Sequence, residues 1–444
     1  MANARAAAVV MHRWVGLGIA GFLVIAGLTG SLLAWNDVLD AALYPALRVQ
    51  TLTDLVPLDP LTIRDRLQAR YPQVTFSSVD LYSEPGKAIV FNVQPVAQKK
   101  RSAASAASAT SAGPGDDAQA FEQAFDQLFV NPYTGQVQGT RLWGDLSQGL
   151  KNFMPFVYRL HYSLALGTAG TSILGIVGLL WTLDCFVGMY LSFPARLRRN
   201  ASRHERADNK PWLTRWRSSW RVRWPGVNAC SAGNGAIHKL NFDLHRAGGL
   251  WIWAMLFVIA WSSVSFNLPG IYNSTMAALF EYQAGDGTAP EAGTQQTGQP
   301  LSWQQARESG RFWMHEQSVL HHFHIEHEAS LSYDASRMEY RYTVRSSRDI
   351  LDKGGATSIW LDAGSGVVKR FFAPTRQASG DTIRTWLTNL HKALLGGVWF
   401  KSFVTLTGMV VVLLCTTGII LWIRKRRAKR LAMTARTSSK MSRR

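Results

Sequence analysis

Cysteine is nearly absent from this chain of 444 residues, and its distribution is informative. Only three cysteines occur, and none of them lies in the two long segments 37–160 and 269–390. These segments must therefore fold without disulfides. No C-x-x-C pair is present either, which excludes dithiol redox chemistry and thiolate metal centres of the zinc-finger kind.

Acidic residues are also scarce, since 29 Asp and Glu stand against 48 Lys and Arg for a net charge of +19. The basic excess is concentrated in two places. Segment 195–244 has eleven basic and three acidic residues, and the tail from Arg424 has ten basic residues and no acidic one. Because loops rich in Lys and Arg stay on the cytoplasmic side of a membrane, this distribution predicts cytoplasmic N and C termini. We expect no nucleic-acid partner.

Four apolar runs are long enough, at about 20 residues each, to cross a membrane. They cover roughly 13–36, 168–193, 247–268 and 398–423. The first run could be a signal peptide, but its apolar part is too long. It is also followed by Leu33-Ala-Trp35-Asn36-Asp37, a poor cleavage site, so we interpret it as a retained anchor.

These runs divide the chain into eight segments. We predict transmembrane helices at 1–36, 161–194, 245–268 and 391–424, which would form a four-transmembrane-helix bundle. Between them we predict two exported α+β domains at 37–160 and 269–390, a basic cytoplasmic loop at 195–244 and a cytoplasmic tail at 425–444.

The two exported segments carry similar patterns, which predicts one kind of α+β fold for both. In the first we expect a helix at 61–67, a strand at 88–93, a flexible insertion at 99–120, and a strand, turn and strand at 127–137. In the second we expect a linker at 283–300, a helix at 302–312, strands around 319–345, and the same strand–turn–strand ending at 358–368.

Two histidine motifs, each present twice, open the apolar runs. His12-Arg13-x-x-Gly-Leu and His245-Arg246-x-x-Gly-Leu precede the first and third runs. Leu-His161-x-x-Leu-x-x-Gly and Leu-His391-x-x-Leu-x-x-Gly precede the second and fourth. The two histidines of each half are 149 and 146 residues apart. Such a repeat indicates duplicated halves with one histidine at the mouth of each span.

The predicted topology sorts these histidines into two pairs. His12 and His245 lie at the inner face, and His161 and His391 lie at the outer face. Two neutral imidazoles facing each other across a helix bundle can ligate the iron of a b-type haem from both sides. The glycines that follow each histidine leave room for a flat macrocycle. We therefore predict two haems b, one per pair, as an electron path across the membrane.

Basic residues flank each histidine and are placed to bind haem propionates: Arg13, Arg246, Arg159 and Lys392. The alternative interpretation is that these histidines lie in the headgroup layer beside basic residues and hold no cofactor. The duplicated pattern, with pairs matched by side, favours the haem interpretation.

Taken in order, these parts resemble the PepSY-associated transmembrane family, bacterial inner-membrane proteins that are iron-regulated and include ferric-siderophore reductases. The resemblance runs from His12 to Trp422, and Thr417-Gly418-Ile-Ile-Leu-Trp422 is similar to the family's usual last span. It implies two periplasmic PepSY-like domains, haem in the helix bundle, and reduction of the ferric iron of a siderophore. Some members carry a fused flavin reductase domain. None is expected in this chain, so its electron donor would be quinol or a cytosolic reductase.

A cluster of five histidines lies between positions 315 and 327 of the second exported segment, with glutamates among them. On a strand His322 and His324 would share one face, and with His327 they could bind iron, copper or zinc. The alternative, which we favour, is a polar and solvated strand or loop.

Asp184 lies inside the second span, where a carboxylate is a functional candidate. It could accept protons from quinol, or it could bond to a Thr or Trp of a neighbouring span. His204 and His238, in the basic loop, are expected to be solvated.

Tryptophans at every fourth position from Trp212 to Trp224 predict an amphipathic helix that lies against anionic membrane lipid. A docking helix for a cytosolic partner is the alternative. In the same loop, Gly233-Asn-Gly235 lacks the strand–loop–helix context that a dinucleotide fold needs.

Two other functions remain open. One is a haem-free scaffold that is anchored in the membrane and binds a periplasmic protein or peptide through its PepSY-like domains. The other is a transporter of iron or siderophore, for which an inverted repeat would be expected. The repeat here runs parallel, which disfavours transport.

Overall fold

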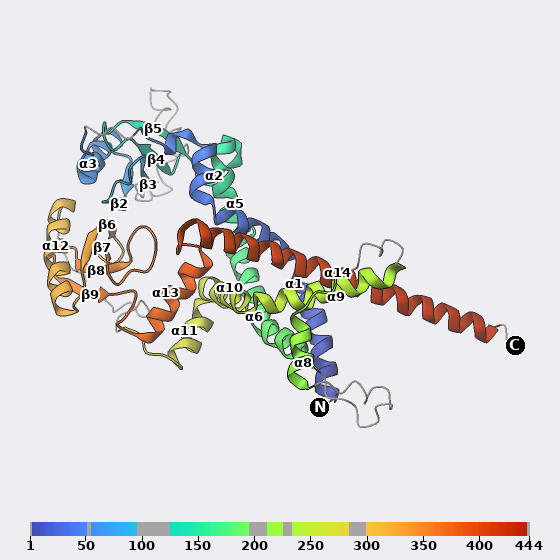
Figure 1. Cartoon of the computed structure of the whole chain (residues 1–444). Coiled ribbons are helices and arrows are strands. Elements are labelled where there is room, and N and C mark those ends of the chain that lie inside the picture. The colour runs from blue at the N-terminus through green and yellow to red at the C-terminus, as the bar shows by residue number, and fades with distance from the viewer. Residues whose placement is uncertain are drawn as a thin grey trace, which may run out of the picture. The chain divides into compact units, whose positions relative to one another are not determined.

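The computed structural model describes residues 2–50, 55–95, 125–194, 211–224, 233–283 and 299–441. The predicted insertion at 99–120, most of the predicted linker at 283–300 and His204 lie outside the described residues. The chain forms two compact units (Figure 1). A helical unit comprises Met1–Ala34, Arg159–Thr275 and Leu390–Arg444, and a sheet unit comprises Trp35–Tyr158 and Met276–Asn389.

The long helices of the helical unit are α1 (Ala2–Leu33), α6 (Gly167–Ser192), α9 (Gly233–Trp251), α10 (Trp253–Asn267) and α14 (Gly397–Met441). Shorter elements are α8 (Trp212–Arg217), η4 (Ser218–Trp220) and α11 (Pro269–Ala277). α1, α6 and α14 are long and apolar enough to cross a membrane, and α9 and α10 meet this criterion together. The described residues thus hold three such helices, or four if the α9–α10 pair is one span.

The third predicted span differs from its expected form. It was expected as one run over 247–268, but the structure begins α9 at Gly233 and bends the chain by 69° between α9 and α10. The break falls at Ile252, whose φ of −115° and ψ of 16° leave the helical region. Gly248 and Gly249 precede the break and weaken the helix locally. His245 therefore lies on a helix that runs in a different direction from α10.

Helices α1, α6, α10 and α14 contribute to one apolar cluster, which is made by Ile19, Leu23, Val177, Cys185, Leu256 and Val411. α1 and α14 lie in close contact at Gly27, where a Cβ atom would lie 2.8 Å from the carbonyl oxygen of Gly408. Small residues allow such contacts between membrane helices. Ser31 stabilises the same contact between α1 and α14, because its Oγ donates to the carbonyl of Thr405 at 3.1 Å.

The sheet unit contains two antiparallel sheets. The first has the order β1-β3-β4-β5, formed by β1 (Val74–Phe76), β3 (Ile89–Pro95), β4 (Gln127–Val130) and β5 (Val137–Arg141). The second has the order β2-β6-β7-β8-β9, formed by β2 (Ser78–Asp80), β6 (Ile325–Asp334), β7 (Glu339–Ser346), β8 (Thr357–Asp362) and β9 (Val368–Phe372).

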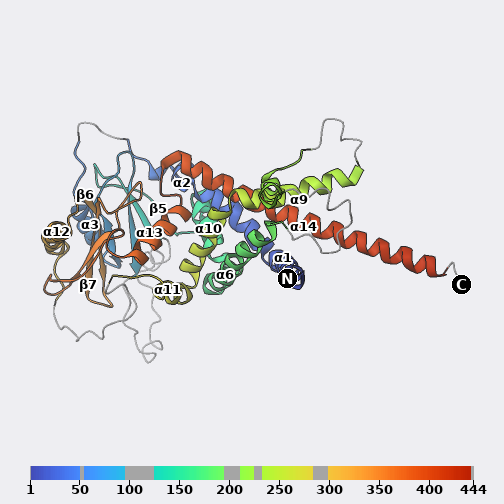
Figure 2. The same cartoon turned by 60° about the horizontal axis from the view of Figure 1, so that its bottom comes forward.

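Helices cover or flank these sheets. They are α2 (Asn36–Leu43), α3 (Pro60–Arg70) and α12 (Trp303–Leu320), with the short turns η1 (Pro45–Leu47), η2 (Leu146–Gln148) and η3 (Leu150–Asn152). α12 packs on β6, β7 and β8. β6 and β7 are labelled beside it in Figure 2. Two further helices, α5 (Phe153–Ser163) and α13 (Ser379–His391), continue from the sheet unit and end inside the helical unit.

The two segments that are predicted to be exported interlock in the sheet unit. β2, from the first segment, pairs with β6 of the second, with Ser78 opposite Ser332 and Asp80 opposite Ser330. One buried apolar cluster likewise joins residues of both segments, among them Phe91 and Tyr342. The two segments predicted as separate domains therefore share a sheet and a core.

The predicted repetition within these segments is visible in their endings. β4 and β5 are joined by a turn in which Asn131 Oδ1 accepts from the Tyr133 amide at 2.9 Å and Gly135 has a φ of 71°. β8 and β9 are joined by the same kind of turn, in which Asp362 Oδ1 accepts from the Ser365 amide at 2.9 Å and Gly366 has a φ of 72°. Glycine adopts a positive φ without strain, so the glycine at each of these positions predicts the turn from the sequence.

A charged cluster also connects the two segments that are predicted to be exported. Arg307 on α12 contacts Asp59, the N-cap residue of α3, at 2.5 Å and also pairs with Glu328 on β6. Arg311 contacts Glu328 at 2.7 Å, and the Tyr342 hydroxyl donates to it at 2.9 Å. Burial opposes the ionisation of Glu328, but these hydrogen bonds outweigh it and lower the pKa of its carboxyl to about 2.

Candidate cofactor site

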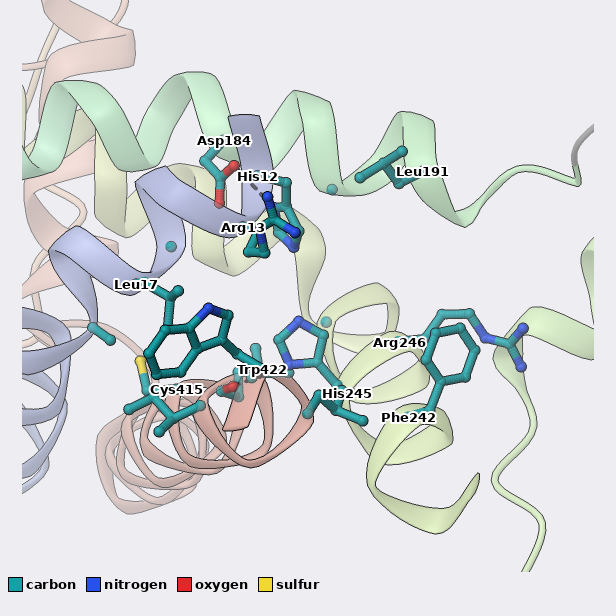
Figure 3. Close-up of a pocket in the computed structure, with 18 of the residues that line it drawn as sticks. His12, Arg13, Leu17, Asp184, Leu191, Phe242, His245, Arg246, Cys415 and Trp422 are labelled. Carbon is teal, nitrogen blue, oxygen red and sulfur yellow. Dashed lines mark hydrogen bonds and ion pairs between the residues drawn. The ribbon is translucent and has the colours of Figure 1, made fainter. Parts of the chain in front are cut away.

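The first candidate site is a pair of histidines from two helices of the helical unit. His12 lies on α1 and His245 on α9, and their ring centres are 6.0 Å apart with an interplanar angle of 63°. Figure 3 shows both imidazoles at one cavity, with Asp184 beside His12. The structure thus brings together the two histidines that the sequence placed on one side of the membrane.

The second candidate site repeats this geometry. His161 and His391 have ring centres 6.1 Å apart and an interplanar angle of 69°. Each lies near the C-terminal end of a short helix, α5 or α13. Positive φ values follow in both places, at Leu164 and Ala165 and again at Ala393, before the next helix begins at a glycine. The repeated Leu-His-x-x-Leu-x-x-Gly motif therefore marks a helix end, a tight turn and the start of a long apolar helix.

All four imidazoles are held through Nδ1 by a neighbouring helix. His12 Nδ1 lies 2.9 Å from Asp184 Oδ1 on α6, and His245 Nδ1 lies 3.0 Å from the Leu414 carbonyl oxygen on α14. His161 Nδ1 lies 2.9 Å from Thr29 Oγ1 on α1. His391 Nδ1 lies 2.6 Å from Ser262 Oγ on α10.

These partners fix the tautomer of each ring. The Asp184 carboxylate and the Leu414 carbonyl can only accept a hydrogen bond. The two hydroxyls can also only accept from the rings, because each already donates its hydrogen. Thr29 Oγ1 donates to the Ile25 carbonyl at 2.6 Å, and Ser262 Oγ donates to the Val258 carbonyl at 2.7 Å. Each Nδ1 therefore carries the hydrogen and donates it.

The consequence concerns the other ring nitrogen. With the hydrogen on Nδ1, Nε2 keeps its lone pair, and among the described residues no hydrogen bond reaches Nε2 in any of the four rings. Histidines that ligate a metal have this arrangement, one nitrogen on the metal and the other donating to an oxygen of the protein. Two imidazoles bound to one metal at about 2 Å would place their ring centres about 6 Å apart, which is the spacing of both pairs.

A cavity of about 1180 Å³ lies beside the His12–His245 pair. This volume is above the range of about 300–1,000 Å³ that is typical of small-molecule and cofactor sites. Most of its wall is apolar, with Leu17, Cys415 and Trp422 among the residues drawn in Figure 3. Six basic residues also line it: Arg5, Arg13, Arg246, Arg424, Lys425 and Arg427. An apolar slot with basic groups suits a flat, apolar molecule that carries carboxylates.

Two of the basic residues predicted to bind propionates line this cavity. The Nε atoms of Arg13 and Arg246 are buried and have no hydrogen-bond partner within the described part of the chain. Arg246 is partly engaged, since one of its terminal nitrogens donates to Asp243 at 3.2 Å. An anionic group in the cavity would satisfy the two buried Nε–H groups.

The other two predicted basic residues belong to the second pair. The Lys392 ammonium lies 5.5 Å from the ring centre of Phe266, and that ring lies 5.1 Å from the ring centre of His391. Arg159 is half-buried one turn before Ser163, whose hydroxyl donates to the Arg159 carbonyl at 2.9 Å. Their contact with propionates stays a prediction.

Glycines on the facing helices make room for three of the four imidazole rings. A Cβ on Gly188 would lie 3.5 Å from His12 Cε1, one on Gly418 would lie 3.3 Å from His245 Cε1, and one on Gly30 would lie 3.1 Å from His161 Cε1. These glycines are far from the histidines in sequence and admit the imidazole rings to the facing helix. Gly16, the glycine of the first histidine motif, lines the cavity with nothing within 4 Å of its added Cβ.

Asp184 is the residue whose partner the sequence did not reveal. Among the described residues it bonds to His12, 172 residues away in the chain, and to no Thr or Trp. Asp184 belongs to no sequence motif, so the sequence indicated only that a carboxylate lies inside an apolar helix. His238, expected to be solvated, is exposed but also lines the cavity.

The predicted exported metal site at His322, His324 and His327 is not assembled. Among the described residues no group of three or more His, Cys, Asp or Glu side chains could hold a metal ion. β6 begins only at Ile325, and His322 has a φ of 52° in the preceding turn, so His322 and His324 do not share a strand face. His327 instead stacks on Tyr82 at 4.2 Å between ring centres.

The tryptophan stripe is helical only in its first part. α8 ends at Arg217 and η4 ends at Trp220, and Trp212 stacks on Trp216 with ring centres 6.0 Å apart. The Trp251 indole nitrogen donates to the Trp220 carbonyl at 3.0 Å, which ties the stripe to the end of α9. Its contact with lipid stays a prediction.

The apolar helices and the paired histidines define a multi-pass membrane protein with two candidate cofactor sites in its helical unit. The chain belongs to the family described as the PepSY-associated TM region, whose model matches residues 9–429. A comparison with curated proteins gives no significant match to this chain.

Proposed function

We propose that this protein is a di-haem electron-transfer protein of the bacterial inner membrane that reduces the ferric iron of siderophores on the periplasmic side. The observation that carries the proposal is the pair of matched sites. Both have imidazole centres about 6 Å apart, and in all four rings Nδ1 donates to a protein oxygen and leaves Nε2 available. Family membership supports the same function by resemblance.

In this proposal His12 and His245 hold one haem b, and His161 and His391 hold the other. A haem with two imidazole ligands takes up and releases one electron at a time. Arg13 and Arg246 would pair with the propionates of the first, and Arg159 and Lys392 with those of the second. The buried Nε–H groups of Arg13 and Arg246 favour this assignment, since an anion would satisfy them.

The spacing of the two sites suits an electron path across a membrane. His12 and Thr29, the partner of His161, are both on α1 and 17 residues apart, which corresponds to about 25 Å along a helix. The hydrocarbon core of a membrane is about 30 Å thick, so the sites would lie near its two faces. Ile19 and Leu23, which belong to the apolar cluster of α1, α6, α10 and α14, lie between these two positions on α1.

The orientation follows from charge. With the basic loop and the basic tail on the cytoplasmic side, the His12–His245 pair faces the cytoplasm and accepts electrons from quinol or a cytosolic reductase. The His161–His391 pair then faces the periplasm, where the acceptor is a ferric siderophore. The oxygen ligands of siderophores hold ferrous iron more weakly than ferric iron, so reduction releases the metal. The tryptophan stripe would lie against membrane lipid.

The proposal is tested by oxidising the reduced protein with its substrate. Purified full-length protein, reduced with dithionite and freed of excess reductant, is mixed with ferric hydroxamate or ferric catecholate siderophores in the presence of a ferrous chelator. We expect the reduced haem bands to decay as the ferrous complex forms. The same siderophores loaded with gallium(III), which is not reducible here, serve as the control. Haem-containing protein that stays reduced with both siderophore classes would contradict the proposed substrate.

The alternative is a haem-free scaffold that binds a periplasmic protein or peptide. It predicts colourless protein even after expression with a haem precursor, and it predicts that replacing His161 or His391 leaves folding and partner binding unchanged. No contact within the described residues favours this alternative over the haem proposal.

A further inference from the structure

The four histidines have unequal partners. His12 donates to a carboxylate, whereas His245 donates to a backbone carbonyl and His161 and His391 donate to hydroxyls. Asp184 is therefore the one charged acceptor in direct contact with the four imidazoles, as far as the described residues show. The two sites have the same spacing of rings but differ in this charge.

The charge lies in a position where it has a large effect. The Asp184 side chain is 10% exposed, and its Oδ1 atom is 2.9 Å from His12 Nδ1. A carboxylate that accepts from Nδ1–H makes the imidazole a more basic and more electron-rich ligand. Such a ligand stabilises ferric over ferrous iron, so it lowers a midpoint potential, and low local polarity strengthens the effect. A neutral hydroxyl that accepts the same hydrogen bond has a much smaller effect.

Nearby cations act in the opposite direction and have to be weighed. Arg13 and Arg246 line the same cavity. Arg246 is already paired with Asp243 at 3.2 Å, and both guanidinium groups are placed for propionates, which would neutralise them. The second site also has two basic neighbours, Arg159 and Lys392. Four further cations line the first cavity, Arg5, Arg424, Lys425 and Arg427, so this site has more cations than the second. The Asp184 carboxylate differs from them because it is hydrogen-bonded to a ligand ring itself, at 2.9 Å from His12 Nδ1, and it therefore acts directly on the basicity of that ligand.

We propose that Asp184 lowers the midpoint potential of the haem held by His12 and His245 below that of the haem held by His161 and His391. The inference rests on the proposed function. It gives the electron path a direction, from the first pair to the second. In this role Asp184 is a positioning residue that acts through His12.

The test is a spectroelectrochemical titration of the haem-loaded, full-length protein. We expect two midpoint potentials in the wild type. Asp184→Asn keeps an acceptor oxygen for Nδ1–H but removes the charge. We expect it to raise the lower potential by at least about 59 mV, the shift for a tenfold change in a one-electron equilibrium, and to leave the other unchanged. Two bound haems with unshifted potentials in this variant would overturn the inference.

A reciprocal variant makes the test independent of how well Asp184→Asn folds. Thr29→Asp places a carboxylate beside His161, so it should lower the upper potential and narrow the gap between the two. If Asp184→Asn loses a haem, the Thr29→Asp titration decides: a fall in the upper potential supports the inference, and an unchanged upper potential overturns it. Wild-type protein without haem overturns the proposed function and this inference with it.

Discussion

The four paired histidines of the helical unit and the histidines of the sheet unit differ in the contacts that their rings make with neighbouring residues. In the helical unit each of the four paired rings gives one hydrogen bond from Nδ1 to a neighbouring helix and keeps Nε2 free of any hydrogen bond among the described residues. In the sheet unit His321 stacks on Phe371 and bonds to Gln377, and His327 stacks on Tyr82. Glu326 and Glu328, on either side of His327, pair with arginines.

This difference shows why density of histidine in the sequence is a poor guide to a metal site. Five histidines within thirteen positions disperse, because a turn at His322 and the start of β6 at Ile325 point them in different directions. Four histidines that are spread over the whole chain converge in two pairs with nearly the same geometry. A site forms where packed helices each position one imidazole ring whose Nδ1 is held by a hydrogen bond to a neighbouring helix.

The largest effect that separates the two groups should come from removing the rings. His161→Ala or His391→Ala should each abolish one of the two haems, because a low-spin site needs both imidazoles. Replacing His322, His324 and His327 together by Ala should leave haem content unchanged. Haem quantitation on the purified variants gives the comparison. Equal haem loss from the triple variant would contradict the assignment of the sites.

The second prediction concerns the ion pairs that Glu328 makes in the sheet unit. Glu328→Gln removes the carboxylate that Arg307 and Arg311 share, and it leaves Arg307 largely buried with one partner fewer. Breaking such a buried ion cluster costs about 3 kcal/mol. Chemical unfolding of the detergent-solubilised protein, followed by tryptophan fluorescence, should show the loss. Glu316→Gln on exposed α12 surface is the matched control and should change stability by less than about 0.5 kcal/mol.

The same carboxylate predicts a dependence on pH. Its pKa falls from the ordinary value of 4.5 to about 2 on folding, so its contribution is fully present above pH 4.5 and is lost as the pH falls toward 2. Thermal unfolding between pH 5 and pH 2.5 should show a falling midpoint in the wild type. A flatter profile is expected for Glu328→Gln, and parallel profiles would show that another group is responsible.

The smallest predicted effect sharpens the geometry of the second pair. A Cβ on Gly30 would lie 3.1 Å from His161 Cε1, so Gly30→Val should displace the ring and weaken haem binding at that site about tenfold. Gly21→Ala, on the same helix and with nothing within 4 Å of its added Cβ, is the control. Haem retention during titration with apomyoglobin measures the difference. Equal retention in both variants would mean that Gly30 has no role in seating His161.

Much of this arrangement could be predicted from local sequence. The repeated histidine motifs named all four ring positions, and the turns at Asn131 and Asp362 followed from glycine spacing. These features depend on residues that are close together in the chain.

The parts that could not be predicted depend on distant contacts. The bond from His12 to Asp184, the ring contacts at Gly30 and Gly418, and the pairing of β2 with β6 each join residues that are far apart in the sequence. The bend at Ile252 could not be placed either, because no proline marks it.

The most direct test of the central claim is the haem content of the wild-type protein. Full-length protein is expressed with a haem precursor, purified in detergent, and assayed by its oxidised and reduced visible spectra with pyridine haemochrome quantitation. The two histidine pairs predict two haems b per chain, with sharp low-spin bands on reduction. Colourless protein that is folded by circular dichroism would contradict the account, and the paired histidines would then need an explanation without haem.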